Sequence, residues 1–330
     1  MRTAAALAAA LLVLVAATGC AGHERSRPEA TPGTTIGSDP VSDPTSVPDT
    51  TRDLAVPGSV IRTELTFVDR TRGTVARPPQ PASPQRELVT TVRRPSSGDG
   101  PWPLVVFGHG FAISSDAYAT LLDAIAASGF VVAAPEFPGS STARPGRPDE
   151  HDLDQEPCDL AVVATEVEAA SAGAGELAGT VRPGPGALAG QSDGATAAAF
   201  AALSGDPCHP GITIVPVAAV VAFSANPVPA AAIDTGLAAP PALLAITGSA
   251  DAVNPASHTR AVFDQWPATA WLLTSRGDGH LAPSTDSPHR SAIDAVVVDF
   301  LHGALDPDPT APDRMTSDAA DPGLTLDHRG

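Results

Sequence analysis

The middle of the chain alternates between short apolar runs and segments whose apolar residues recur at helical spacing. The apolar runs lack polar alternation, which is typical of strands buried on both faces of a parallel sheet. We predict strands at residues 59–68, 87–92, 104–107, 130–134, 186–190, 217–223, 243–247 and 270–274. We predict helices at residues 116–127, 160–170, 195–203, 258–265 and 290–301.

This order of elements predicts an α/β fold with a doubly wound, mostly parallel sheet. The first two strands alternate partially and are separated by Gly73 and several prolines, so we expect them to form a leading antiparallel pair. In open α/β sheets, ligands bind outside the carboxyl ends of the strands. Residues that directly follow a predicted strand are therefore the first candidates for chemistry.

The N-terminus has the pattern of an export signal. Arg2 precedes an apolar run at residues 4–17, which is shorter than the roughly 20 residues that a membrane span needs. Ala17-Thr18-Gly19-Cys20 resembles the bacterial lipobox, and this resemblance implies that Cys20 carries a lipid and becomes the mature N-terminus. We therefore predict a lipoprotein-type signal peptide at residues 1–19 and an exported, membrane-anchored protein, with plain secretion as the alternative.

Two further segments have the composition of disordered chain. Residues 20–53 are rich in Pro, Ser, Thr, Asp and Gly and contain few large apolar residues, so they cannot offset the entropy of ordering. We predict a flexible tether there. Residues 306–330 have a similar composition, and we predict a disordered acidic tail. One catalytic domain remains, at residues 54–305.

Charge excludes one class of partner. The chain has 37 acidic residues against 19 arginines and no lysine, which gives a formal net charge of −18. This sign is wrong for binding the phosphate backbone of a nucleic acid. We expect no nucleic-acid partner, and we expect the protein to be a monomer.

Cysteines and acidic residues suggest no bound metal. Cys158 and Cys208 remain in an exported chain, so we predict a disulfide that closes a loop of about 50 residues. A metal pair is the weaker alternative, because neither cysteine has a Cys-x-x-Cys spacing. An acidic loop contains His151, Asp152, Asp154 and Glu156. We favour solvated loop charge for these residues, with a calcium-binding loop as the alternative. We expect neither metal nor cofactor.

A serine motif follows the predicted strand at residues 186–190. Gly190-Gln191-Ser192-Asp193-Gly194 matches G-x-S-x-G, in which a sharp strand-to-helix turn exposes the serine hydroxyl. Glycine is needed on both sides because side chains there would collide with neighbouring backbone. The motif alone arises easily by chance, but the strand before it and the helix after it supply the required setting. Ser192 is our predicted nucleophile.

A serine nucleophile needs a base and a carboxylate that orients it. His280 lies on a glycine-rich loop after the last predicted strand, where the chain order of serine, acid and histidine puts the base. Asp251 directly follows the strand at residues 243–247 and is our predicted acid. Asp278 is the rival, but it lies only two residues from His280, and we expect it to form a turn.

Acyl transfer also needs hydrogen-bond donors for the developing oxyanion. Gly108-His109-Gly110-Phe111 follows the predicted strand at residues 104–107. We predict that the backbone N–H groups of Phe111 and Asp193 form the oxyanion hole. His109 is then a structural residue of this loop rather than a second base.

These pieces, in this order, resemble the α/β-hydrolase superfamily. The segment 106–139 and the Ser192 turn are most similar to the exported dienelactone-hydrolase, chlorophyllase-like and polyester-hydrolase (cutinase-like) branch. The resemblance implies a carboxylic-ester hydrolase that needs no cofactor, with Ser192, Asp251 and His280 as its triad. Many polyester hydrolases have His and Met where this chain has Gln191 and Asp193.

Two other functions remain open at this point. An acyltransferase would use the same acyl-enzyme but pass the acyl group to an alcohol or sugar. A surface binding protein could use an inactive hydrolase scaffold. We favour a hydrolase of small to medium acyl esters and expect no large lid, because no insertion is long enough to form one. The segment at residues 225–240 lies between two predicted strands and could border the acyl pocket.

Overall fold

The computed structural model describes residues 60–98, 100–204, 207–208, 215–234, 236–306 and 308–330. These residues belong to one compact unit, Thr51–Gly330. The predicted signal peptide, Cys20 and the predicted tether lie outside the described residues.

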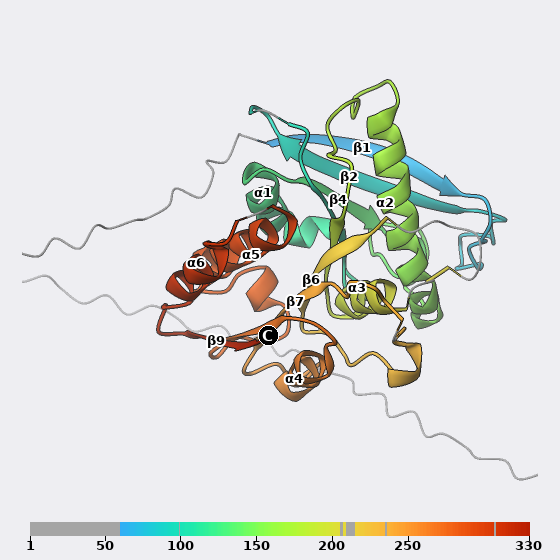
Figure 1. Cartoon of the computed structure of the whole chain (residues 1–330). Helices are drawn as coiled ribbons and strands as arrows, with labels where there is room; N and C mark the ends of the chain where they lie inside the picture. Colours follow the sequence, from blue (N-terminus) through green and yellow to red (C-terminus); the bar gives the residue numbers. More distant parts are fainter. Residues whose placement is uncertain (1–59, 99, 205–206, 209–214, 235, 307) are drawn as a thin grey trace, which may run out of the picture. The chain divides into compact units, whose positions relative to one another are not determined.

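Nine strands of the described chain form one sheet (Figure 1), in the order β1-β2-β4-β3-β5-β6-β7-β8-β9. The strands are β1 (Val60–Asp69), β2 (Arg86–Pro95), β3 (Leu104–Gly108), β4 (Val131–Glu136), β5 (Gly186–Gln191), β6 (Val217–Phe223), β7 (Ala242–Gly248), β8 (Ala270–Ser275) and β9 (Leu324–Arg329). Strands β3 to β8 are parallel to their neighbours among themselves, whereas β1–β2, β2–β4 and β8–β9 are antiparallel. The predicted leading antiparallel pair and the mostly parallel sheet are confirmed.

Helices cover both faces of this sheet, which explains the unbroken apolar strands (Figure 1). They are α1 (Ala119–Ala127), α2 (Glu156–Ala172), α3 (Asp193–Leu203), α4 (Ala256–Gln265), α5 (Arg290–Leu305) and α6 (Ala311–Asp318). One core contains side chains of α2, α3 and α4, and the other contains side chains of α1, α5 and α6. Neighbouring residues of β3 divide between the two, with Val106 in the first core and Val105 in the second.

The C-terminal segment corrects the prediction. The prediction of a disordered tail at residues 306–330 is wrong, because the described residues 308–330 contain α6 and β9. Met315 and Leu324 are buried in the core beside α5, and β9 pairs with β8 along its whole length. Arg314 on α6 also donates to Asp299 on α5 at 2.8 Å. A few buried apolar residues and the free edge of β8 order a segment whose average composition is polar.

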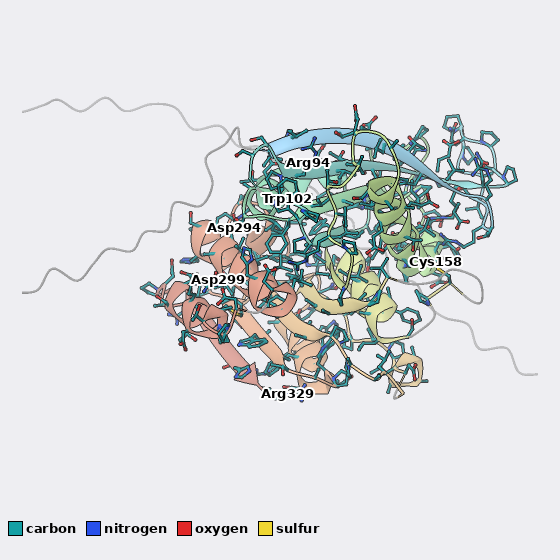
Figure 2. The ribbon with its side chains drawn as sticks, turned by 45° about the horizontal axis from the view of Figure 1, so that its top comes forward. Arg94, Trp102, Cys158, Asp294, Asp299 and Arg329 are labelled. Atoms are coloured by element: carbon teal, nitrogen blue, oxygen red, sulfur yellow. A yellow bond between two sulfur atoms is a disulfide. The ribbon has the colours of Figure 1, made fainter. Side chains whose placement is uncertain are left out.

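The predicted disulfide is confirmed. Cys158 on α2 (Figure 2) is bonded to Cys208, with their Cα atoms 4.8 Å apart. The bond closes a loop of 50 residues that contains β5, Ser192 and α3. It therefore ties the helix after the serine turn to the long helix beside it.

The connection between β6 and β7 contains no large lid among its described residues. Its regular structure is limited to the three-residue 3₁₀ helix η3 (Ala230–Ala232). The predicted absence of a large lid is thus consistent with the described part of this connection. None of the described helices is long and apolar enough to cross a membrane.

Candidate active site

The three residues of the predicted triad follow three strands of the parallel part of the sheet, in which β6 separates β5 from β7 and β8. Ser192 comes directly after β5, Asp251 follows β7, and His280 follows β8. Because these strands are parallel, their carboxyl ends meet at one edge of the sheet. Residues 88 positions apart in sequence are therefore brought together there.

A tight backbone turn presents Ser192. The residue has φ 56° and ψ −119°, in the left-handed region that is costly for a residue with a side chain. A Cβ atom built at Gly190 would lie 2.4 Å from the backbone of Gly194, and one built at Gly194 would lie 2.3 Å from the carbonyl oxygen of Gly108. Both glycines are thus required by close backbone approach. The turn is also held by the Ser192 N–H, which donates to the carbonyl of Phe223 at 2.8 Å.

The side chains of the predicted triad form a continuous hydrogen-bonded line. His280 Nε2 lies 2.9 Å from Ser192 Oγ, and His280 Nδ1 lies 2.8 Å from Asp251 Oδ2. The Asp251 side chain is fully buried, whereas the His280 side chain keeps 15% of its surface exposed. The imidazole of His280 therefore reaches solvent, whereas the carboxylate of Asp251 does not.

Hydrogen bonds keep the Asp251 carboxyl ionised. Burial by itself raises the pKa of Asp251, but hydrogen bonds from His280 and from the N–H groups of Val253 and Asn254 outweigh it and lower the pKa below its ordinary value. The two backbone N–H groups bind Oδ1 at 2.9 Å each, which leaves Oδ2 for the imidazole. In the predicted triad, an ionised Asp251 would fix the proton of His280 on Nδ1 and leave Nε2 to accept the serine proton.

Asp278 does not compete for this role. Its Oδ2 accepts a hydrogen bond from Ser275 Oγ at 2.6 Å, and its backbone carbonyl accepts one from the N–H of Ala250 at 2.9 Å. A Cβ atom built at Gly248 would lie 2.3 Å from that carbonyl oxygen. Asp278 thus shapes the loop that carries His280, as a turn-forming residue does.

The predicted oxyanion donors lie on either side of Ser192. Asp193 is the first residue of α3 and directly follows Ser192. Phe111 follows Gly110, and a Cβ atom built at Gly110 would lie 3.3 Å from Ser192 Cβ. Within the described part of the chain, the N–H groups of Phe111 and Asp193 have no hydrogen-bond partner. Both donors are therefore free to bind an oxygen beside the serine.

His109 is a structural residue of this loop, as predicted. Its ring is fully buried, Nδ1 donates to the Gly110 carbonyl at 2.8 Å, and Nε2 accepts from the N–H of Phe137 at 3.0 Å. Burial lowers the pKa of His109 below its ordinary value. The neutral ring links the loops after β3 and β4 and has no nitrogen left for proton transfer.

The side chain of Asp193 is a half-buried carboxyl group near His280. Burial raises the pKa of Asp193, the neighbouring His280 lowers it, and Glu150 raises it further. The net effect is a raised pKa, although the start of a helix ordinarily favours a carboxylate. The residue therefore has two separate properties, a backbone donor and a carboxyl group that ionises with difficulty.

The acidic stretch at residues 151–156 is only partly solvated, which corrects the prediction of loop charge for Asp152 and Glu156. Asp152 is buried, and its two carboxylate oxygens accept hydrogen bonds from the two terminal nitrogens of the fully buried Arg86. Arg86 Nη1 lies 2.8 Å from Oδ1. Burial raises the pKa of Glu156 well above its ordinary value, and its Oε1 accepts from Ser140 at 2.5 Å. The described residues contain no group of three or more His, Cys, Asp or Glu side chains that could hold a metal.

Sequence reasoning missed Glu136, which binds the segment after the predicted oxyanion loop and the loop after β4. Its Oε1 accepts hydrogen bonds from the N–H and the hydroxyl of Ser115 at 2.9 and 2.5 Å, and its Oε2 accepts one from Ser141. The neighbouring Ser140 carbonyl accepts from the N–H of Ala112, next to Phe111, at 3.0 Å. One signal was present in the sequence, because Glu136 is the only charged residue of the otherwise apolar strand β4.

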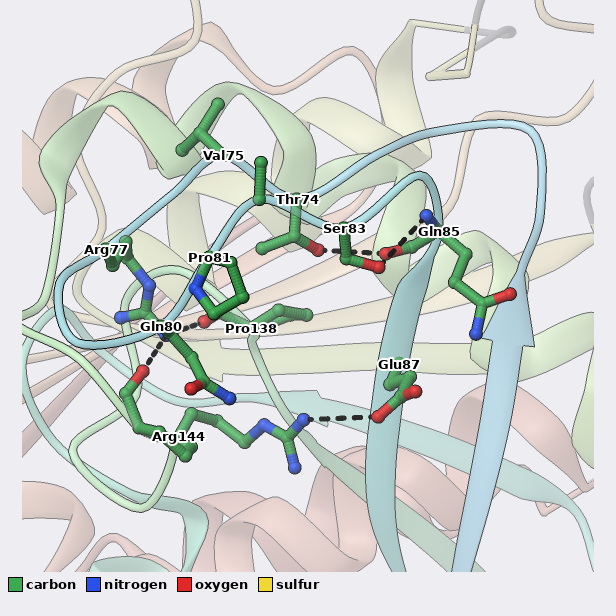
Figure 3. Close-up of a pocket in the computed structure, with 12 residues that line it drawn as sticks. Thr74, Val75, Arg77, Gln80, Pro81, Ser83, Gln85, Glu87, Pro138 and Arg144 are labelled. Atoms are coloured by element: carbon green, nitrogen blue, oxygen red, sulfur yellow. Dashed lines mark hydrogen bonds and ion pairs between the residues drawn. The ribbon is translucent and has the colours of Figure 1, made fainter.

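A separate cavity lies away from this site. It has a volume of about 180 Å³ and lies between residues 74–87 and residues 138–145 (Figure 3). Arg77 donates to the carbonyls of Pro138 and Pro145 there, and Arg144 lies 3.8 Å from Glu87. The residues that line this cavity include none of the predicted catalytic residues.

The fold and the site define an α/β hydrolase. The family model described as chlorophyllase matches residues 66–256, more than half of the chain, so the protein belongs to the chlorophyllase family, a group of α/β hydrolases with ester-hydrolysing activity. No curated protein matches the chain. The matched segment includes Ser192 and Asp251, while His280 lies beyond its end.

The assignment of the acid makes a direct prediction. Replacing Asp251 with Asn should lower kcat by on the order of 10⁴, because the imidazole would lose the partner that fixes its tautomer. The matched control is Asp278→Asn, which should keep kcat within about threefold, since this carboxyl binds Ser275. Steady-state hydrolysis of a p-nitrophenyl ester measures both. Equal losses in the two variants would contradict the assignment.

Proposed function

We propose that the protein is a serine hydrolase that cleaves carboxylic esters through an acyl-enzyme. The observation that carries this proposal is the position of His280, whose two ring nitrogens lie within 2.9 Å of Ser192 Oγ and Asp251 Oδ2. A histidine on a solvent-exposed loop without a catalytic role would not be expected to contact both a strained serine and a buried carboxylate. This geometry is that of a nucleophile, its base and the group that orients the base.

The first half of the reaction forms the acyl-enzyme. Ser192 Oγ attacks the ester carbonyl carbon while its proton moves to His280 Nε2, and the carbonyl oxygen becomes an oxyanion that accepts from the N–H groups of Phe111 and Asp193. Asp251 stabilises the imidazolium. The carbon–oxygen bond to the alcohol then breaks, and His280 returns the proton to the departing alcohol oxygen.

The second half uses water in place of the serine hydroxyl. A water molecule gives a proton to His280 Nε2 and attacks the acyl carbon, the oxyanion forms again, and the bond to Ser192 Oγ breaks as the serine regains its proton. The products are a carboxylic acid and an alcohol. Every proton in this cycle is carried by His280, so the chemistry needs no cofactor.

A fluorophosphonate probe tests the proposed chemistry, because it reacts with an activated serine. Wild-type protein should be labelled, whereas Ser192→Ala should not be labelled and should lose at least about 10⁴-fold in kcat. Ser317→Ala, at an exposed serine on α6, is the matched control and should react like wild type. Labelling that persists in Ser192→Ala would contradict the proposal. Mostly transfer product in the presence of an added alcohol would instead favour an acyltransferase.

We also propose small to medium apolar acyl esters as substrates. Three large apolar side chains of the described residues are exposed, Val253 at 65%, Val75 at 55% and Leu281 at 38%. Val253 lies two residues after the predicted acid, and Leu281 follows the predicted base. An ester with an apolar chain would cover both side chains at the mouth of the site.

Substrate length should therefore matter through these two residues. Val253→Ser and Leu281→Ser should each lower kcat/KM for a hexanoate ester by about 3- to 10-fold, because less apolar surface would leave water on binding. The loss for an acetate ester should be smaller. Val75→Ser changes the third exposed apolar residue, on a different part of the surface, and should follow wild type for both esters. Parallel losses on acetate and hexanoate would contradict an apolar contact.

We propose that the protein is exported and anchored to a membrane through a lipid on Cys20. The disulfide between Cys158 and Cys208 supports export, since such bonds persist in oxidising compartments outside the cytoplasm. An N-terminal lipid would then hold the catalytic domain at the membrane surface through the predicted tether. Secretion without a lipid is the alternative.

Cell fractionation tests the anchor. In a bacterial host, Cys20→Ala should move the protein from the membrane fraction to the soluble extracytoplasmic fraction while the purified domain keeps its esterase activity. Metabolic labelling with a fatty-acid analogue should mark wild type alone. Unchanged membrane retention in Cys20→Ala would count against lipidation at this residue.

A further inference from the structure

Tyr118, the only tyrosine in the chain, lies behind the predicted oxyanion loop. Its ring is fully buried and packs on Phe107, with ring centroids 4.9 Å apart. Its hydroxyl accepts a hydrogen bond from the N–H of Gly110 at 3.3 Å and donates one to Gln191 Oε1 at 2.9 Å. Burial raises the pKa of Tyr118 well above its ordinary value, so the hydroxyl keeps the proton that it donates.

Gln191 continues this line toward the predicted base. It is the last residue of β5 and is 1% exposed. Its Nε2 donates to the backbone carbonyl of His280 at 3.2 Å, and Ser224 Oγ donates to the same carbonyl at 3.3 Å. The orientation of the amide follows from its partners, because the tyrosine hydroxyl needs an acceptor and the carbonyl needs a donor.

The packing leaves little freedom in this link. A Cβ atom built at Gly110 would lie 2.6 Å from Gln191 Oε1, so the backbone of the oxyanion loop rests directly on the amide. Each polar group in the line has a partner, which a buried polar group requires to avoid a large desolvation cost. The result is one buried connection from Gly110 through Tyr118 and Gln191 to His280.

We propose that Tyr118 and Gln191 are positioning residues that hold the oxyanion loop and the backbone of His280 at a fixed separation. The inference rests on the proposed function. In that reaction the oxyanion donors and the imidazole act on opposite sides of the same carbonyl carbon, so their spacing must fit the transition state. Asp251 orients the ring of His280, whereas Gln191 and Ser224 hold its backbone.

Tyr118→Phe tests the link with the smallest change, since it removes one hydroxyl and keeps the buried ring. It would leave the Gly110 N–H and Gln191 Oε1 without a partner, and both loops could then shift. We expect kcat to fall by about 10- to 100-fold, the range for a small misplacement of reacting groups, while KM changes less than about threefold. Gln191→Met, which keeps side-chain length but removes both amide atoms, should produce a similar loss.

Two comparisons separate positioning from a loss of stability. Trp266→Phe removes another buried hydrogen bond, from Nε1 to the Pro241 carbonyl at 2.7 Å, and should lower the unfolding midpoint without changing kcat more than about twofold. The double variant Tyr118→Phe/Gln191→Met should lose little more kcat than either single variant, because both changes break one link.

The outcomes distinguish this inference from the proposed function. If wild type reacts with the fluorophosphonate and Tyr118→Phe keeps its kcat, the inference is wrong and the proposed function stands. Strictly additive losses in the double variant, or an equal loss of kcat in Trp266→Phe, would also overturn the inference. A wild type that neither hydrolyses esters nor reacts with the probe would remove the proposed function, and this inference with it.

Discussion

The site depends on a close approach of backbones that only glycine permits. Strand β3, the end of β5 and the start of α3 meet at Gly108, Gly190 and Gly194, where a Cβ atom at either of the last two would lie 2.3 or 2.4 Å from neighbouring backbone atoms. This contact forces the turn that puts Ser192 in a left-handed conformation at the edge of the sheet. It also brings the loop after β3 against the serine, so one steric constraint places both the predicted nucleophile and the predicted oxyanion donors.

A second layer of constraint comes from buried charge. Arg86 on β2 binds both Asp152 and Asp159, and all three side chains are at most 2% exposed. Such a group resists separation, because removing one partner would leave an uncompensated charge in the interior. Asp152 also fills the space beside Gly139, where no Cβ atom could fit. The charges thus hold the loop after β4, whose Ser140 carbonyl in turn fixes the oxyanion loop.

The parts of this molecule that could be predicted from sequence are those encoded by contiguous residues. The buried strands appear as unbroken apolar runs, and Ser192 appears in a five-residue motif. Asp251 and His280 follow from chain order and strand ends. The link from Tyr118 to Gln191 joins residues 73 positions apart, and the sequence around neither residue predicts it. The same limit applies to Asp152, which the sequence predicts as solvated loop charge but which pairs with Arg86, 66 positions away.

The error at the C-terminus has a physical cause that bears on the base. The average composition of a segment indicates whether that segment can fold by itself. Strand β9 does not fold by itself, because its backbone forms its hydrogen bonds with the free edge of β8. Strand β8 carries the loop with His280, and its register against β7 pairs Ser275 with Gly248. Beyond this pair, the Ala250 N–H donates to the Asp278 carbonyl, which brings together the loops that carry Asp251 and His280. Because β9 covers the outer edge of β8 along its whole length, the C-terminal segment supports the element on which the proposed proton transfer depends.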